Sequence, residues 1–190
     1  MKDDFGGSTG NITEPVNAGQ GRIYGAEFSS QYAFGDVIAP WLTGLGTAVN
    51  YTYSQSQTNS QVTSYSHDSG IPGVAKNALT GTLYYERFGF SARASYSWRD
   101  KAVNDSLVGA TFPIPDAAAK NGELIGQVFQ APYGQLDAQI GYDFNKHVGV
   151  FFSAQNITNS AQHTYLQFPN QPFTYDDSGS RYFVGVKGKL

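Results

Sequence analysis

Residues 89–98 alternate strictly between polar and apolar side chains. The even positions carry Phe90, Ala92, Ala94, Tyr96 and Trp98, and the odd positions carry glycine, serine or arginine. A β-strand points successive side chains to opposite faces, so this segment is expected to form a strand with one apolar and one polar face. Lipid-spanning β-barrels need strands of about ten residues with this pattern, apolar toward lipid and polar toward the lumen.

The same two-residue period recurs along the chain and predicts an all-β protein. Seven strands are expected, at residues 22–34, 45–55, 77–86, 89–98, 135–144, 148–157 and 182–190. Consecutive strands would pair as an antiparallel meander.

The connections between these segments alternate in length. Short turns are expected near residues 35–40, 87–89 and 145–147, and long loops near residues 56–76, 100–132 and 158–180. Outer-membrane barrels have short periplasmic turns and long extracellular loops, so the alternation also orients the sheet. Three long loops on one side favour a functional role for that end.

The composition fits a membrane barrel better than a soluble enzyme. The 190 residues include 13 tyrosines and 13 phenylalanines, against 12 lysines and arginines together. The mean hydropathy is nevertheless negative, at −0.36, because polar rows alternate with apolar ones. No run of 18 apolar residues exists for a helical span, which leaves a closed barrel as the structure able to satisfy its backbone in lipid.

Charge and cysteine content exclude two further classes. The net charge of −3, without a basic patch, argues against a nucleic-acid partner. The absence of cysteine excludes a disulfide framework. Residues 1–21 lack the apolar core of a secretory signal, so we expect a piece of a longer exported protein. A soluble β-sheet module, which would bury its apolar face against a second sheet, is the alternative.

Four short motifs carry a resemblance to a known family. They are GRIYGAEF at residues 21–28, IPGVAKN at 71–77, FFSAQNITN at 151–159 and GSRYFVGV at 179–186. In this order and spacing they resemble the C-terminal barrel strands of TonB-dependent outer-membrane receptors. The resemblance covers nearly the whole chain. It implies that residues 1–190 are the last seven of 22 strands of a transmembrane β-barrel, with the plug domain and earlier strands absent.

The resemblance also implies a function and a location. Such a protein is an active transporter in the outer membrane of a Gram-negative bacterium, and it imports a scarce extracellular solute with energy supplied through TonB. Its partners would be membrane lipid, the plug domain and remaining strands, the TonB complex and a small-molecule solute. A passive, porin-like or structural barrel is the alternative. The family usually ends on an aromatic residue, with another two positions earlier, whereas this chain ends with Gly188 and Leu190.

Aromatic residues of the last long loop are the candidate ligand-binding residues, since stacking onto sugars or planar chelates needs exposed rings. They are Tyr165, Phe168, Phe173 and Tyr175. The alternative is that the loop folds over its neighbours and buries these rings.

Charged residues of the polar rows are expected to face the barrel lumen. They are Glu27, Arg93, Arg99, Asp137 and Asp143. A structural role in a polar wall is favoured over solute guidance, because a wide lumen needs polar walls whatever it conducts.

No enzyme, cofactor or metal site is expected. His67, His147 and His163 are far apart and none has a second histidine at ligand spacing. The segment at residues 176–179 lacks the spaced ligands and distal glutamate of a calcium loop, and no Ser/His/Asp set is identifiable from the sequence alone.

Overall fold

The structure is a computed structural model. It describes residues 2–5, 8–11, 20–35, 39–58, 70–104, 112–113, 123–124, 128–166 and 168–188. These residues form antiparallel strands and a 3-10 turn, η1 (Pro40–Leu42). Among them, no helix combines the length and apolarity needed to cross a membrane.

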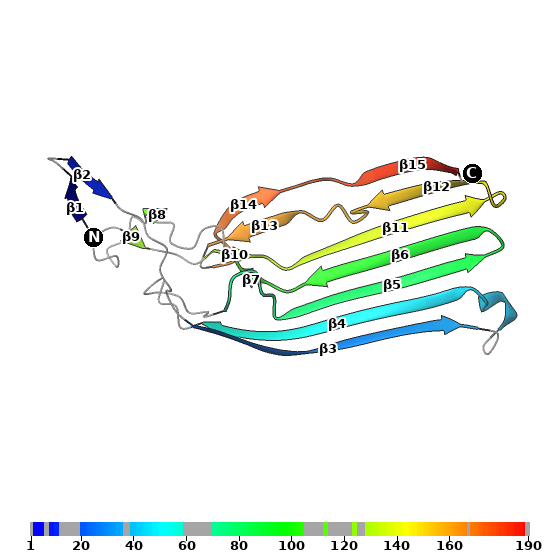
Figure 1. The fold of residues 1–190 in the computed structure, drawn as a ribbon, viewed down its shortest axis with the longest axis horizontal. Coiled ribbons are helices and arrows are strands. Elements are labelled where there is room, and N and C mark those ends of the chain that lie inside the picture. Colours follow the sequence, from blue (N-terminus) through cyan, green and yellow to red (C-terminus); the bar gives the residue numbers. More distant parts are fainter. Residues whose placement is uncertain are drawn as a thin grey trace.

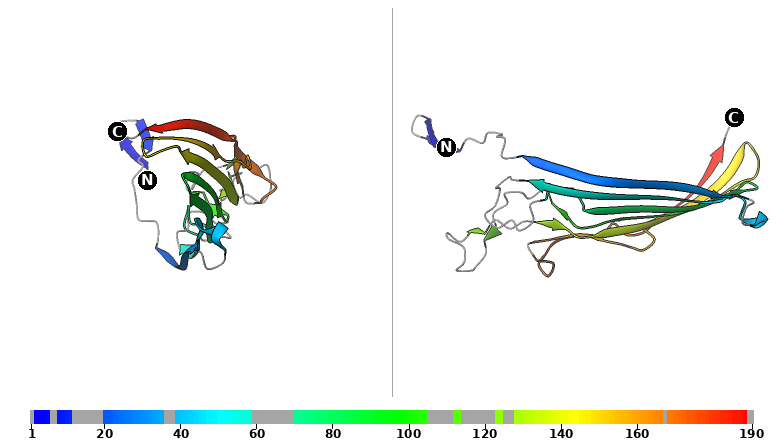
Figure 2. Two further views of the ribbon diagram at one scale, coloured as in Figure 1. Left: turned by 90° about the vertical axis from the view of Figure 1, so that its right-hand side faces the viewer. Right: turned by 90° about the horizontal axis from the view of Figure 1, so that it is seen from below.

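Seven long strands form the main sheet, as the alternation predicts. They are β3 (Gly21–Phe34), β4 (Leu45–Thr58), β5 (Asn77–Arg87), β6 (Phe90–Arg99), β11 (Tyr133–Asp143), β12 (Val148–Gln155) and β15 (Arg181–Gly188). The order across the sheet is β15-β12-β11-β6-β5-β4-β3, so each strand lies beside its predecessor in this series (Figure 1). Viewed along the strands, the sheet curves into an arc (Figure 2).

Several strand ends differ from the prediction. β4 continues to Thr58 rather than residue 55, and β11 begins at Tyr133 rather than 135. β12 ends at Gln155 rather than 157, because Asn156 adopts a positive φ of 52° that extended backbone cannot contain. The last strand ends at Gly188, and residues 189–190 lie outside the described part of the chain.

The pairing register places the apolar rows of all seven strands on one face. Ala94 of β6 lies opposite Leu83 of β5 and Ala138 of β11, while Ser95 lies opposite Thr82 and Asp137. Directly opposed residues in an antiparallel pair point to the same side. Every further pairing of the sheet keeps this relation, so one face is apolar and the other polar from β3 to β15.

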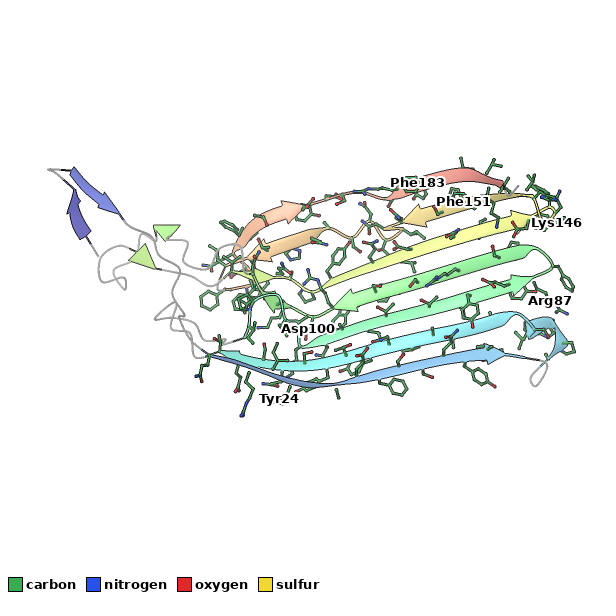
Figure 3. All side chains as sticks on the ribbon, in the orientation of Figure 1. Tyr24, Arg87, Asp100, Lys146, Phe151 and Phe183 are labelled. Carbon is green, nitrogen blue, oxygen red and sulfur yellow. The ribbon has the colours of Figure 1, made fainter. Side chains whose placement is uncertain are left out.

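Large rings interrupt the polar face where a neighbouring strand provides a glycine. Phe151 of β12 lies opposite Gly141 and Gly185 (Figure 3), and a Cβ added at position 185 would collide with its ring. Tyr84 of β5 lies opposite Gly46 of β4, and a Cβ added at position 46 would likewise collide with the tyrosine ring. Glycine in a strand marks such close approaches. The phenylalanine that breaks the polar row at residue 151 is thus accommodated by glycines beside it.

The short turns have the residues that their geometry needs. Phe88 and Gly89 both have positive φ, 53° and 78°, which is the requirement of a two-residue type I′ hairpin turn between β5 and β6. Between β11 and β12, the Asn145 side chain accepts hydrogen bonds from the backbone N–H groups of His147 and Val148, at 2.8 and 3.0 Å.

The long connections are not strand-free, which corrects the prediction of plain loops. A second sheet has the order β14-β13-β10-β7, from β7 (Ala102–Val103), β10 (Phe129–Gln130), β13 (Gln162–Tyr165) and β14 (Pro172–Asp176). Two isolated pairs also form, β1 (Lys2–Phe5) with β2 (Ser8–Asn11) and β8 (Phe112–Pro113) with β9 (Glu123–Leu124). These strands are too short for a periodic sequence signal, and β10 pairs with segments distant in the chain.

Candidate functional site

The three long connections are joined to one another at one end of the main sheet. Residues 100–104 and 158–176 belong to different connections, yet β10 pairs with strands of both. The connection between β4 and β5 is attached as well, because the Gly73 N–H donates to the Val103 carbonyl at 2.8 Å. This end therefore has a common framework (Figure 1) rather than three independent loops.

The buried core of this framework is aromatic. Phe129 and Tyr165 stack with ring centroids 5.5 Å apart, beside Val103 and Ala131, and all four residues are at most 7% exposed. Tyr165 is thus a packing residue in this structure, as the burial alternative for this loop describes. Its role in ligand binding stays a prediction, and its ring is not exposed in this structure.

The other three candidate ligand-binding aromatics are exposed. Tyr175 of β14 is 72% exposed and stacks on His163 of β13, with centroids 6.5 Å apart. Phe168 is 55% exposed and lies in the connection between β13 and β14, and Phe173 of β14 is 37% exposed. The β13–β14 hairpin thus brings these three rings to one small element, and their contact with a ligand stays a prediction.

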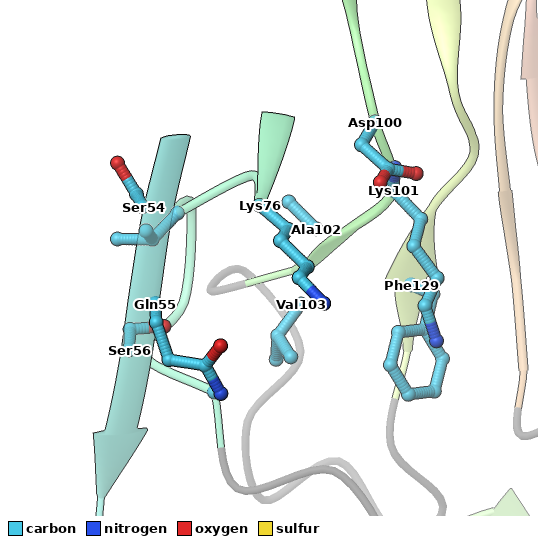
Figure 4. A pocket seen from close by; sticks show the side chains of 11 residues that line it. Ser54, Gln55, Ser56, Lys76, Asp100, Lys101, Ala102, Val103 and Phe129 are labelled. Carbon is cyan, nitrogen blue, oxygen red and sulfur yellow. The ribbon is translucent and has the colours of Figure 1, made fainter. Parts of the chain in front are cut away.

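A cavity of about 140 Å³ lies beside this framework, between the end of β4 and β7. Ala102, Val103 and Phe129 are buried residues of its lining, whereas Lys76 and Lys101 are exposed. Figure 4 shows Lys76 between β4 and the Ala102–Val103 segment, and Lys101 alongside the Phe129 ring. The cavity combines an apolar floor with cationic groups at its edge.

This cavity was not found from the sequence. Lys76 belongs to a motif that was noted for its resemblance to the family, but Lys101 and Phe129 fall in a stretch without periodicity. The approach of β7 to β4 depends on pairing between distant segments, which no local signal reports. One indication was present in the sequence, an aromatic residue, Phe129, shortly before the start of β11.

The polar face of the main sheet carries all five charged residues of the lumen prediction. Glu27 accepts a hydrogen bond from Asn50 at 2.9 Å, and Asp143 forms an ion pair with Lys187. Arg99 lies in register between Ala78 and Tyr133 of the neighbouring strands. Asn50 lies on β4, the strand adjacent to that of Glu27, whereas Lys187 reaches Asp143 of β11 from β15, across β12. That this face borders a lumen stays a prediction.

Arg93 and Asp137 come together in a broad, open depression of about 310 Å³ on this face, with Ser95, Gln139 and Ser153. Asp137 also has a structural role. Its Oδ1 accepts hydrogen bonds from the Gln135 side chain at 2.7 Å and from the backbone N–H of Asn156 at 2.9 Å.

Asn156 connects the end of β12 to the beginning of β15. It is 5% exposed, and its side-chain amide donates to the carbonyls of Ser160, at 3.0 Å, and Gly179, at 3.3 Å. Its side-chain oxygen accepts from the Ser160 N–H at 2.9 Å, and its carbonyl accepts from the Ser180 hydroxyl at 2.7 Å. This network gives a physical reason for the asparagine at the strand ending FFSAQNITN.

No metal centre is visible among the described residues, where no three His, Cys, Asp or Glu side chains gather closely enough to hold an ion. His147 lies in the turn after β11 and His163 on β13. His67 lies outside the described residues.

Comparison with known proteins identifies the family. The family model described as TonB dependent receptor-like, beta-barrel matches residues 2–157. No curated protein and no solved structure gives a match. The matched range includes six of the seven long strands and most of the polar face described above. The chain therefore belongs to the TonB-dependent receptor β-barrel family, a family of transporters of the Gram-negative outer membrane.

Proposed function

We propose that this chain is the C-terminal part of an active transporter that binds a scarce extracellular solute and imports it with energy supplied through TonB. The observation that carries the proposal is the two-faced register of the main sheet. An apolar face on all seven strands suits contact with lipid, and a charged face suits a water-filled interior.

The arrangement of the edges supports membership of a larger barrel. β3 and β15 are the outermost strands of the sheet, and within the described residues no strand pairs with their outer sides. Open edges do not persist in hydrocarbon, because each unpaired backbone group costs several kcal/mol there. Further strands, together with a plug domain inside the closed barrel, are the proposed partners of this sheet.

The two ends of the sheet have different proposed environments. The short turns, including Phe88–Gly89 and the Asn145 turn, would face the periplasm. The long connections and their four-stranded sheet would face the outside, where the solute is captured. TonB itself would act on the N-terminal part of the parent protein.

Energy-dependent uptake tests this proposal. The full-length receptor is expressed in an outer-membrane host, with and without functional TonB, and supplied with a radiolabelled ferric hydroxamate chelate, cyanocobalamin or a maltooligosaccharide. We expect one class to accumulate only when TonB is functional. Accumulation that is independent of TonB, and unselective among small solutes, would instead establish a passive barrel.

A loop variant tests the place of solute capture. Replacing Phe168, Phe173 and Tyr175 together with alanine is expected to weaken whole-cell binding of the transported solute about tenfold or more, because exposed rings supply contact area at low entropic cost. Tyr165 is left intact because its ring is buried against Phe129. Surface labelling controls for receptor number. Unchanged affinity at an unchanged surface level would assign these rings to packing.

A further inference from the structure

Charged side chains in the apolar rows of the main sheet lie only at its two ends, and they are cationic. The rows of the seven long strands contain Arg22, near the start of β3, and Arg87, the last residue of β5, but no acidic residue. Arg22 lies opposite Gln57 of β4 and Arg87 opposite Phe90 of β6, so the register places both arginines on the apolar face. This face therefore carries positive charge at each end and none between.

The two arginines lie about one membrane thickness apart. Gln57 is twelve positions from Leu45 along β4, and Leu45 lies opposite Tyr85, two positions before Arg87. At about 3.3 Å per residue, the separation along the strands is roughly 45 Å. Strands tilted by about 40° convert this into roughly 35 Å across the membrane, between about 30 Å for the hydrocarbon core and about 40–45 Å with headgroups. Each arginine would thus lie at the depth of lipid phosphates.

The short turns around Arg87 hold its side chain in place. Its Nη1 donates a hydrogen bond to the Pro40 carbonyl at 2.6 Å, and its guanidinium carbon lies 4.6 Å from the ring centroid of Phe88. The Glu86 N–H donates to the Gly44 carbonyl at 2.8 Å, so the turn that contains η1 and the β5–β6 turn are joined. Figure 3 shows Arg87 at this end of the sheet. An arginine oriented in this way loses less rotamer freedom when it binds an anion.

The Arg87 guanidinium retains donors for such an anion. The Pro40 carbonyl accepts from one of its nitrogens, whereas a guanidinium has several N–H donors in a planar fork. Within the part of the chain that the structure describes, no carboxylate forms an ion pair with Arg87. Phosphate oxygens match the guanidinium fork in pairs, which makes a phosphate the anion that this geometry suits best.

Exposed aromatic rings lie at the same end of the sheet. Phe88, under the guanidinium, is 82% exposed, and Trp41 of η1 is 72% exposed. Phe90 and Tyr142 face each other in the apolar rows of β6 and β11, and both are exposed. Aromatic rings are enriched where lipid headgroups meet acyl chains. A lipid with its phosphate at Arg87 would place its acyl chains against such rings.

We propose that Arg87 and Phe88 form a binding site for the phosphate of a glycerophospholipid. The inference rests on the proposed function for one point, the periplasmic position of the short turns, because glycerophospholipids form the periplasmic leaflet of the outer membrane and lipopolysaccharide the external one. The site lies at the opposite end of the sheet from the long connections, so lipid binding here is separate from solute capture.

Photo-crosslinking tests the inference without requiring transport. The full-length receptor in detergent is incubated with a subsaturating phosphatidylglycerol that carries a diazirine near the glycerol end of one acyl chain, and labelled peptides are mapped by mass spectrometry. We expect labelling within residues 77–93, and labelling about tenfold weaker in Arg87→Gln, since charge-assisted hydrogen bonds are lost. Arg87→Lys should retain part of the labelling, because it keeps the charge without the paired donors. Arg93→Gln removes the same charge from the polar face of β6 and should leave the labelling unchanged.

Competition identifies the group that is recognised. Unlabelled phosphatidylglycerol should displace the probe, whereas lipopolysaccharide, free glycerol phosphate and a diacylglycerol with the same acyl chains should each displace it at least tenfold less well. Equal displacement by the diacylglycerol would overturn phosphate recognition, and stronger displacement by lipopolysaccharide would overturn the choice of lipid.

Unchanged labelling of Arg87→Gln, with the native heat-modifiable mobility, would also overturn the inference. If this variant does not assemble, Arg87→Lys and competition on the wild type decide. TonB-dependent uptake is measured separately, so a passive barrel would still show this lipid binding and the two failures remain distinguishable.

Discussion

Replacing Asn156 with alanine is expected to loosen the link between β12 and β15 by roughly 4 kcal/mol. The substitution removes three side-chain hydrogen bonds from a residue that is 5% exposed. Each is worth about 1 kcal/mol, and its half-buried partners, on Ser160 and Gly179, would lose the side chain that satisfies them. Alanine at a φ of 52° adds about 1 kcal/mol of steric cost. The sum corresponds to about a thousandfold change in the opening equilibrium.

Matched variants separate the two contributions. Asn156→Gly removes the hydrogen bonds but tolerates the positive φ, so a loss of about 3 kcal/mol is expected. Asn159→Ala is the control, because Asn159 also has a positive φ, 50°, but is exposed. It should cost only about 1 kcal/mol.

Hydrogen exchange of the full receptor in detergent, followed by mass spectrometry, measures these differences in peptides that span residues 156–165 and 177–184. Exchange should accelerate most for Asn156→Ala, less for Asn156→Gly and least for Asn159→Ala. If Asn156→Ala exchanges no faster than Asn159→Ala, the side-chain network does not hold this junction and the reasoning is refuted.

Two further substitution pairs test the faces and the packing of the main sheet. Ala94→Arg places a charge on the apolar face and should reduce the amount of assembled receptor, at a cost of about 2–4 kcal/mol near the membrane midplane. Ser95→Arg, on the polar face, should lose only the hydroxyl contact with Thr82, about 1 kcal/mol. Comparable yields of the two variants in outer-membrane fractions would contradict the face assignment. Gly25→Ala should lower the unfolding temperature, because an added Cβ would overlap a backbone carbonyl of β4, at about 1–3 kcal/mol. Gly81→Ala meets no atom within 4 Å and should be neutral, so equal melting of the two would disprove the close approach at Gly25.

The long strands could be predicted because their signal is local and repeated. Ala94 is apolar and Ser95 is polar because neighbouring residues of a strand point to opposite faces of the sheet. The two faces have different environments along every strand, so the same alternation is repeated in each. Strand ends were less predictable. β12 ends where Asn156 turns the backbone, and this turn depends on carbonyls of Ser160 and Gly179 farther along the chain.

The candidate site was predictable only in part. The aromatic residues of the last loop were identified from composition, which cannot distinguish the buried Tyr165 from the exposed Tyr175. Burial of Tyr165 depends on Phe129, which lies 36 positions earlier and reaches it through pairing of β10 with β13. Strands of two residues carry no periodic signal, so neither this pairing nor the cavity beside Lys101 could be derived from spacing.

The pairing of β10 with both β7 and β13 has a consequence for how such a receptor can change its specificity. If residues 158–176 were exchanged alone for those of another receptor, β10 would lose a partner strand and the ring of Phe129 would lose Tyr165. The segment at residues 100–104 is tied to the same strand and, through Gly73, to the connection before it. Exchange of one segment would therefore disturb the other two, so new specificity is expected to arise through coordinated replacement of all three.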